Sequence, residues 1–262
     1  MALTLTSPPD FLKLLAHDLR WQLLTALTHS DYRVQELAAK LERPMNLVSY
    51  HLRQLREAGL VQERRSSADG RDVYCSLNMN ELVARFRASG AMLFPALADE
   101  QPIAPSTTPM RLLFLCTHNS ARSQMAEALL RAKQGERPIE VVSAGDHPGT
   151  VHPTAIATLR ELGIDMRGQT SKHLDDFREQ HFDYIVTVCD QVREHCPTFP
   201  GTPEANHWST PDPALATGTP AEAETFRHIA TQLAARVDTL LLQIDHAAAN
   251  IAVSRPVGEG VR

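Results

Sequence analysis

The spacing of apolar residues in the first hundred positions predicts a small, mainly helical domain. Leucines recur every three or four residues and are interrupted by polar breaks at Ser30-Asp31 and at Gly59. Two short strand-like runs flank Asp69-Gly70, a pair that favours a tight hairpin turn. Helices are predicted at residues 10–27, 34–41, 45–58 and 80–97, and strands at 60–65 and 71–77. Helices followed by a hairpin in this order are typical of a winged helix-turn-helix domain.

The second part of the chain alternates between apolar strand patterns and helical patterns. Strands are predicted at residues 112–115, 139–143 and 183–188, and helices after Arg122 and at 152–162 and 226–246. Such an order predicts an α/β domain with a parallel sheet, in which ligands bind at the carboxyl ends of the strands. We therefore expect a winged-helix domain at 1–98, a proline-containing linker at 99–110, the α/β domain at 111–246 and a flexible tail at 247–262.

Composition adds only broad limits to this picture. Hydrophobic residues make up 43% and charged residues 22% of the 262 positions, as in ordinary soluble proteins. No signal peptide and no apolar run of roughly 18 residues is evident, so we expect a cytoplasmic protein without a membrane partner. Four cysteines in that setting indicate thiol chemistry rather than a disulfide scaffold.

The charge is unevenly spread along the chain. The net charge is −5, and the second part carries the acidic excess. Residues 43–71 hold six arginines against Glu57, Glu63 and Asp69. This local basic excess lies where a helix-turn-helix domain would touch DNA.

A cysteine and an arginine are separated by five residues in the loop after the strand at 112–115. Such a strand-to-helix loop directs backbone N–H groups inward, and the helix N-terminus adds positive charge, which together suit a tetrahedral oxyanion. Thiols beside cations and helix N-termini ionise more readily than free cysteine, so we expect Cys116 to act as a thiolate nucleophile. Arg122 can bind two oxygens of the anion, while Asn119 and Ser123 can hold the loop and the sulfur.

Two further thiols, Cys189 and Cys196, follow the strand at 183–188 and are therefore expected at the same edge of the sheet. A second thiol can attack the sulfur of a first adduct, and a third can pass the disulfide on to an external reductant. Incidental cysteines are the alternative, and the spacing is not one of the usual zinc patterns.

Residues 48–61 and 70–74, VSYHLRQLREAGLV and GRDVY, resemble the recognition helix and the wing of ArsR-family repressors. The resemblance implies a homodimer that reads two half-sites of a double-stranded DNA operator. Residues 31–60 hold no cysteine, so a thiolate sensor pair is not expected there; His51 and Cys75 are interpreted as core residues. The expected DNA contacts are Asn46, Ser49, Tyr50, Arg53 and Gln54 on the helix, with Arg64, Arg65 and Arg71 on the wing.

Residues 116–127, CTHNSARSQMAE, resemble the anion loop of low-molecular-weight protein tyrosine phosphatases and, still more, of thioredoxin-coupled arsenate reductases. The resemblance extends over about 111–245. It implies arsenate as substrate, thioredoxin as reductant, Cys189 and Cys196 as the resolving pair, and no tightly bound cofactor. Asn119, Glu127 and Ser143 fall where the reductases can support a potassium ion.

In both families an aspartate before a proline lies opposite the anion loop, so the resemblance implies that Asp212, which precedes Pro213, can protonate a leaving oxygen there. Ala214-Leu215 follow instead of the aromatic residues with which phosphatases grip phosphotyrosine, which favours a small inorganic substrate. Two alternatives stay open: a phosphatase with accidental extra thiols, and a non-catalytic transcription factor that responds to arsenic compounds.

Overall fold

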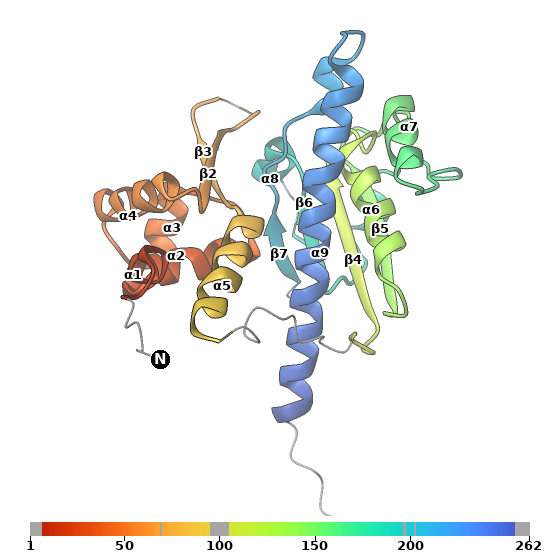
Figure 1. Ribbon diagram of the computed structural model, residues 1–262. Helices are drawn as coiled ribbons and strands as arrows, with labels where there is room; N and C mark the ends of the chain where they lie inside the picture. The colour runs from red at the N-terminus through yellow and green to blue at the C-terminus, as the bar shows by residue number, and fades with distance from the viewer. Residues whose placement is uncertain (1–6, 69, 95–104, 196–197, 202, 255–262) are drawn as a thin grey trace, which may run out of the picture. The chain divides into compact units, whose positions relative to one another are not determined.

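The computed structural model divides the chain into two compact units, Met1–Pro102 and Ile103–Arg262 (Figure 1). The structure describes residues 7–68, 70–94, 105–195, 198–201 and 203–254. Each unit has its own hydrophobic core.

The first unit consists of helices and a small antiparallel sheet whose strand order is β1-β3-β2. Its elements are α1 (Asp10–Leu15), α2 (Asp18–His29), β1 (Tyr32–Arg33), α3 (Val34–Lys40), α4 (Met45–Glu57), β2 (Val61–Arg65), β3 (Val73–Leu77) and α5 (Met79–Leu93). β2 and β3 form the hairpin expected from the sequence, with Glu63 opposite Cys75. The predicted winged helix-turn-helix order is therefore confirmed, apart from the short strand β1, which the sequence pattern did not indicate.

Two local predictions in this unit were wrong. The single helix expected at 10–27 is broken, because His17 adopts an extended conformation and its Nδ1 accepts a hydrogen bond from the N–H of Leu19 at the start of α2. The helix expected at 80–97 ends at Leu93, because Phe94 adopts an extended conformation.

The second unit is an α/β domain built on a parallel sheet with strand order β5-β4-β6-β7. Its elements are β4 (Met110–Cys116), α6 (Arg122–Lys133), β5 (Ile139–Gly145), α7 (Pro153–Glu161), η2 (Leu174–Phe177), β6 (Tyr184–Thr187), α8 (Asp190–His195), β7 (Glu204–His207), η3 (Pro213–Ala216) and α9 (Glu222–Ser254). β4 is central and apolar, with Leu112 and Leu115 fully buried. The predicted fold class is confirmed.

The long helix α9 packs along α6 and α7 (Figure 1). It continues to Ser254, so the flexible tail predicted from residue 247 begins as helix instead. The stretch from Ala247 to Ala252 is rich in alanine, the strongest helix former. Within the described part of the chain, no helix is both long enough and apolar enough to cross a membrane.

Part of the predicted linker is fixed to this unit. Ser106 is buried, and its N–H donates to Asp245 Oδ1 on α9 at 2.7 Å. Arg137 donates to both oxygens of the same carboxylate, at 2.9 and 2.7 Å. Burial by itself raises the pKa of Asp245, but the hydrogen bonds from Arg137 and Ser106 outweigh it and keep that pKa low. The linker residues 99–104 lie outside the described residues.

Candidate active site and DNA interface

The candidate anion loop lies at the carboxyl end of the central strand. β4 ends at Cys116 and α6 begins at Arg122, so five residues form the turn between them. Asn119 within the turn has a φ of 46°, a left-handed conformation that asparagine tolerates better than most residues. The helix start adjoins the turn and directs the positive end of its dipole toward it.

The Cys116 side chain is buried and receives polar contacts from its own loop. The N–H of Asn119 donates to Cys116 Sγ at 3.1 Å, and Ser123 Oγ lies 2.8 Å from the same sulfur. Cys116 itself is only 3% exposed. The loop thus places two hydrogen-bonding groups around the sulfur.

Asn119 fixes the loop through every polar atom of its side chain. Its Nδ2 donates to Ser123 Oγ at 2.9 Å and to Ser143 Oγ at 2.8 Å. Its Oδ1 accepts from Gln124 Nε2 at 2.9 Å and from the backbone N–H of Lys172 at 2.8 Å. The loop conformation is therefore held by contacts with β5 and with the segment before η2.

The last residue of β5 is a glycine because the loop backbone packs directly on it. A Cβ built on Gly145 would lie 2.7 Å from the backbone nitrogen of Asn119 and 2.8 Å from the carbonyl oxygen of Thr117. Such distances are sterically forbidden, so the loop geometry requires glycine at this position.

Arg122 lies at the first turn of α6 and is bound to the loop that carries Asp212. Its guanidinium donates to Asp212 Oδ2 at 2.8 Å and to the carbonyl oxygen of Thr210 at 3.1 Å. The residue is only 5% exposed. Asp212 also accepts a hydrogen bond from the N–H of Ala214 through Oδ1 and so caps η3. The two side chains expected on either side of the anion are therefore in direct contact.

A second thiol, Cys189, lies at the end of β6 next to the anion loop. Its Sγ is 3.3 Å from Oγ1 of Thr117, the residue after Cys116. Burial raises the pKa of the Cys189 thiol, and the nearby Cys116 raises it further, whereas Arg122 and the Thr117 hydroxyl act in the opposite direction. Cys196, the third thiol of the proposed relay, lies outside the described residues.

A buried polar group that the sequence did not reveal anchors the start of α8. His207 at the end of β7 and Asp190, the residue after Cys189, are both fully buried and lie 3.1 Å apart through Nε2 and Oδ1. Ser209 donates to the same carboxylate oxygen at 2.8 Å. β7 carries the sequence EANH, which lacks an apolar strand pattern, and this explains why the strand was not predicted.

The three residues expected to support potassium come together, but their oxygens are already in use. Ser143 Oγ donates to Glu127 Oε2 at 2.5 Å and accepts from Asn119. Glu127 Oε1 accepts from Arg131 at 2.5 Å, and Lys172 Nζ lies 3.4 Å from Oε2. Potassium needs several oxygens that replace its hydration shell. This group, with two cationic side chains at its carboxylate, does not fit such an ion.

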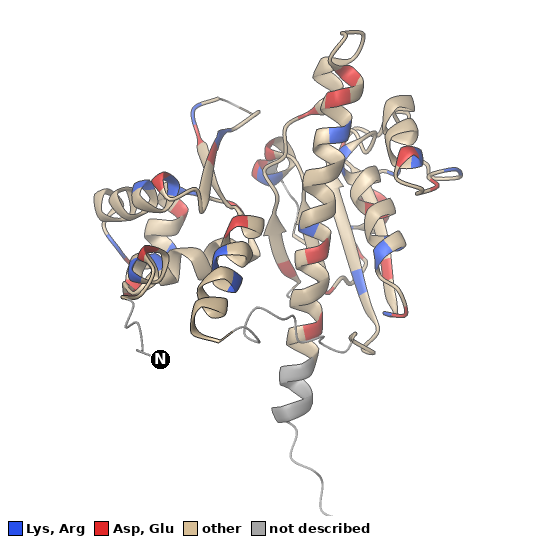
Figure 2. Ribbon diagram, viewed as in Figure 1, with Lys and Arg blue, Asp and Glu red and all other residues tan. Residues whose placement is uncertain are grey.

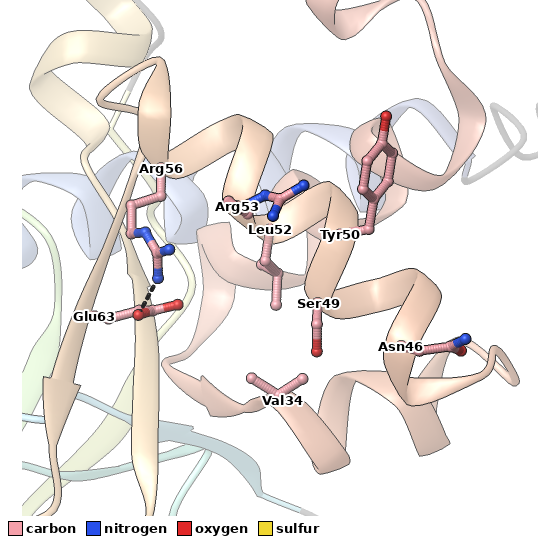
Figure 3. Close-up of a pocket in the computed structure, with 8 residues that line it drawn as sticks. All are labelled: Val34, Asn46, Ser49, Tyr50, Leu52, Arg53, Arg56 and Glu63. Carbon is pink, nitrogen blue, oxygen red and sulfur yellow. Dashed lines mark hydrogen bonds and ion pairs between the residues drawn. The ribbon is translucent and has the colours of Figure 1, made fainter.

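The residues expected to touch DNA lie on α4 and on the β2–β3 hairpin. Four of them on α4 line a groove of about 480 Å³: Asn46, Ser49, Tyr50 and Arg53 (Figure 3). All four are exposed, Tyr50 by 47%. The sequence thus places four polar side chains on one accessible side of the helix.

Other expected contact residues are engaged within the unit. Gln54 accepts from Arg20 on α2 at 2.8 Å and donates to the Tyr50 hydroxyl at 2.9 Å. Arg64 donates to the carbonyl oxygen of Arg65, and Arg65 donates to that of Gly70. Gln54 therefore holds the Tyr50 hydroxyl in place, and both its amide oxygen and its amide nitrogen are engaged within the unit. Arg71 is exposed and lies two residues before β3 begins.

Acidic residues lie among the basic ones on this surface. Arg56 on α4 forms an ion pair with Glu63 on β2, and both line the groove (Figure 3). Figure 2 shows the same mixture of signs along α4 and the hairpin. The basic excess inferred from the sequence is therefore partly neutralised at the surface itself.

The two residues interpreted as core are buried. His51 packs against His17 with ring centroids 4.3 Å apart, and burial lowers its pKa, as does the neighbouring charge of His17. Cys75 is fully buried, and burial raises its pKa to about 12. Among the described residues, no group of three or more potential ligands is placed to hold a metal ion.

Comparison with known proteins assigns families to both regions. Residues 111–250 match the family model described as low molecular weight phosphotyrosine protein phosphatase. The chain belongs to this family. Residues 17–63 match the bacterial regulatory protein, arsR family. Both family resemblances inferred from the sequence are thereby confirmed, as is their fusion in one chain.

Curated relatives of high similarity align with about half of this chain. An arsenate reductase of Halalkalibacterium halodurans is 39% identical over 129 residues, which cover 49% of this chain and 92% of that protein. A glutaredoxin arsenate reductase of Synechocystis sp. is 34% identical over 51% of this chain and 98% of its own length. A solved arsenate reductase in an oxidized state is 34% identical over 52% of this chain and 98% of its own, with a TM-score of 0.45.

Proposed function

We propose that the second unit reduces arsenate to arsenite through a relay of thiols, and that the first unit binds operator DNA. The contact between Cys189 and Thr117 in the anion loop carries this proposal, because ester hydrolysis by a cysteine nucleophile needs only one thiol. Relatives named arsenate reductase support the same choice of substrate.

Arsenate binds in the turn between β4 and α6. The backbone N–H groups of the turn and the guanidinium of Arg122 receive its oxygens. Arg122 is bound to Asp212 in the free protein, so an incoming anion competes for the guanidinium. Transfer of Arg122 to the substrate releases the Asp212 carboxyl for proton transfer.

The first chemical step forms a bond between Cys116 Sγ and arsenic. The thiolate donates an electron pair to arsenic, and one As–OH bond breaks. Asp212, which takes up a proton from solvent once Arg122 has moved to the substrate, gives this proton to the departing hydroxyl, which leaves as water. Arsenic stays in the +5 state in this thiol adduct. Arg122 and the loop amides stabilise the charge that builds on the remaining oxygens.

The second step supplies the two electrons. The Cys189 thiolate attacks Cys116 Sγ, a disulfide forms, and the electron pair of the breaking S–As bond stays on arsenic, which leaves as arsenite. Cys196 then attacks Cys189 and frees Cys116 as a thiolate. A dithiol protein of the thioredoxin or glutaredoxin class reduces the Cys189–Cys196 disulfide and so provides the electrons.

A steady-state assay tests this proposal and identifies the reductant. Arsenite formation is followed with thioredoxin and its reductase, and in parallel with glutaredoxin and glutathione. We expect turnover with thioredoxin and loss of turnover in both Cys189→Ser and Cys196→Ser. An aryl phosphate ester serves as the comparison substrate: rapid ester hydrolysis without reductant-dependent arsenite formation would identify a phosphatase instead.

For the first unit we propose a homodimer that reads two half-sites of double-stranded DNA with α4. Support comes from exposed polar residues on α4 and from exposed apolar residues at the end of α5, where Met92, Leu93 and Phe94 are 60%, 79% and 61% exposed. Sedimentation of the full chain with and without operator fragments tests the dimer. Titration with arsenate and arsenite tests whether either compound controls DNA affinity, and a response without any reduction would indicate a non-catalytic sensor.

A further inference from the structure

Glu127 is a buried carboxylate behind the candidate anion loop, and two cationic side chains neutralise it. Its side chain is 4% exposed. Arg131, one turn further along α6, donates to Oε1 at 2.5 Å, whereas Lys172 places Nζ 3.4 Å from Oε2. A carboxylate buried to this extent is stable in its charged form only when it is paired.

Lys172 reaches the loop through its backbone as well as through its side chain. Its N–H donates to Asn119 Oδ1 at 2.8 Å, and its Nζ donates to the carbonyl oxygen of Thr170 at 3.1 Å. Ser171, the preceding residue, donates to the carbonyl oxygen of Asn119 at 2.6 Å. The segment 170–172 thus braces the loop at the residue whose N–H binds the nucleophilic sulfur.

A continuous series of contacts joins the lysine to the nucleophile. Lys172 contacts Glu127, Glu127 accepts from Ser143, Ser143 accepts from Asn119, and Asn119 donates to Cys116. Loss of the positive charge at the start of this series would leave Glu127 with Arg131 alone, whose side chain is 50% exposed.

We propose that the Lys172 ammonium group is a built-in cation that holds the anion loop in its binding conformation, so that the loop needs no potassium ion. Lys172 is a positioning residue, because it acts through Glu127, Ser143 and Asn119 and not on the substrate. The proposal rests on the proposed function only in that the loop binds a tetrahedral oxyanion. It deepens that function by defining the ionic conditions in which the site is active.

The direct test compares the wild-type full chain in potassium chloride and in tetramethylammonium chloride at equal ionic strength. The first readout is the rate at which iodoacetamide alkylates Cys116, followed at the Cys116 peptide by mass spectrometry, which requires no bound anion. The second readout is protection of Cys116 by inorganic phosphate. We expect the same rate and the same protection in both salts.

Variants at Lys172 show whether the side chain supplies the cation. Lys172→Met in tetramethylammonium chloride is expected to weaken phosphate protection about tenfold, as when a group that orients a binding site is removed. Potassium chloride should restore part of that loss, because the vacated position then admits an external cation. Lys172→Arg should keep protection in both salts. Lys133→Met is the matched control, since it removes a surface ion pair with Asp238 in the same unit.

Two results would overturn the proposal. One is a wild-type protein whose alkylation rate or phosphate protection depends on potassium. The other is a folded Lys172→Met variant that matches the wild type in tetramethylammonium chloride. Neither result bears on arsenate reduction, whereas a protein that is salt-independent in alkylation but forms no arsenite would contradict only the proposed function.

Discussion

The anion loop of the second unit and helix α4 of the first unit present their polar groups in opposite ways. In the loop, Asn119 and Ser123 are fully buried, and their polar atoms bond to other atoms of the same unit. Along α4, Asn46 and Ser49 are exposed. Both regions combine polar side chains with the start of a helix. In the anion loop these side chains are buried and bonded within the unit, which we call the closed arrangement. On α4 they are exposed, which we call the open arrangement.

The difference reflects what each region has to do. A catalytic loop lowers a barrier when its dipoles are fixed before the substrate arrives, because no reorganisation is then needed during the reaction. A helix that reads DNA has to offer donors and acceptors that can reach base edges and phosphates in a groove. Buried contacts are therefore what the proposed catalysis requires of the loop, and accessible groups are what the proposed DNA recognition requires of α4.

Gly145→Ala should produce the largest change, because it disrupts the closed arrangement of the anion loop at the point where the loop packs on β5. The added methyl group meets the backbone of Thr117 and Asn119, so the loop must move. A displacement of that kind is expected to lower arsenate reduction by about 100-fold. Gly149→Ala is the matched control, because a Cβ there lies 4.0 Å from its nearest neighbour, the carbonyl oxygen of His118. Equal activity of the two variants would show that the loop is not rigid.

Arg53→Ala tests the open arrangement on α4. The Arg53 guanidinium lies over the Tyr50 ring and is only loosely paired with Glu57, at 3.9 Å. A base contact made by this side chain is worth about 1–3 kcal/mol, so operator affinity should fall by roughly 5- to 150-fold. Binding is measured by fluorescence anisotropy at fixed salt, with Lys13→Ala on α1 as control. An unchanged affinity would show that Arg53 makes no contact with DNA.

The rate of the second chemical step should rise with pH. Burial, together with the nearby Cys116, raises the pKa of Cys189, so little of it is thiolate at neutral pH. Below that pKa the thiolate fraction grows about tenfold per pH unit, and arsenite release in a single turnover should follow it. Thr117→Val removes a hydrogen bond that lowers this pKa and should shift the profile to higher pH. A profile that is flat above neutral pH would contradict this assignment.

Glu63→Gln should have the smallest effect, and in the opposite direction to Arg53→Ala. The substitution removes the carboxylate that pairs with Arg56 beside the groove and leaves the arginine available to phosphates. Exposed ion pairs of this kind are worth about 0.2–1 kcal/mol, which corresponds to an increase in DNA affinity of up to about fivefold. Glu81→Gln on α5 is the control. Weaker binding would mean that Glu63 itself contacts DNA or orients Arg56.

The sequence was most informative where local pattern and chemistry agree. Four apolar residues predicted a central strand. Cys116 and Arg122, at the start of a helical repeat, predicted the loop after it. The Asp-Pro pair at Asp212 could likewise be picked out, and the structure places its side chain against Arg122. Such features depend on residues that are close in sequence.

Features that depend on distant partners could not be predicted. Lys172 meets Glu127 across 45 residues, and no local pattern indicates that contact. β7 is a strand only because its backbone pairs with β6, since its side chains do not alternate between apolar and polar. The contacts of Gln54 with Arg20, 34 residues away in the sequence, could not be predicted either, and its contact with DNA stays a prediction.

The most direct test of the redox relay is a single-turnover measurement of arsenite on the reduced full chain without an external reductant. The relay predicts one arsenite per chain and a Cys116–Cys189 disulfide for Cys196→Ser, and no arsenite for Cys189→Ser. One equivalent of arsenite from Cys189→Ser, or a disulfide in Cys196→Ser that does not include Cys189, would contradict it.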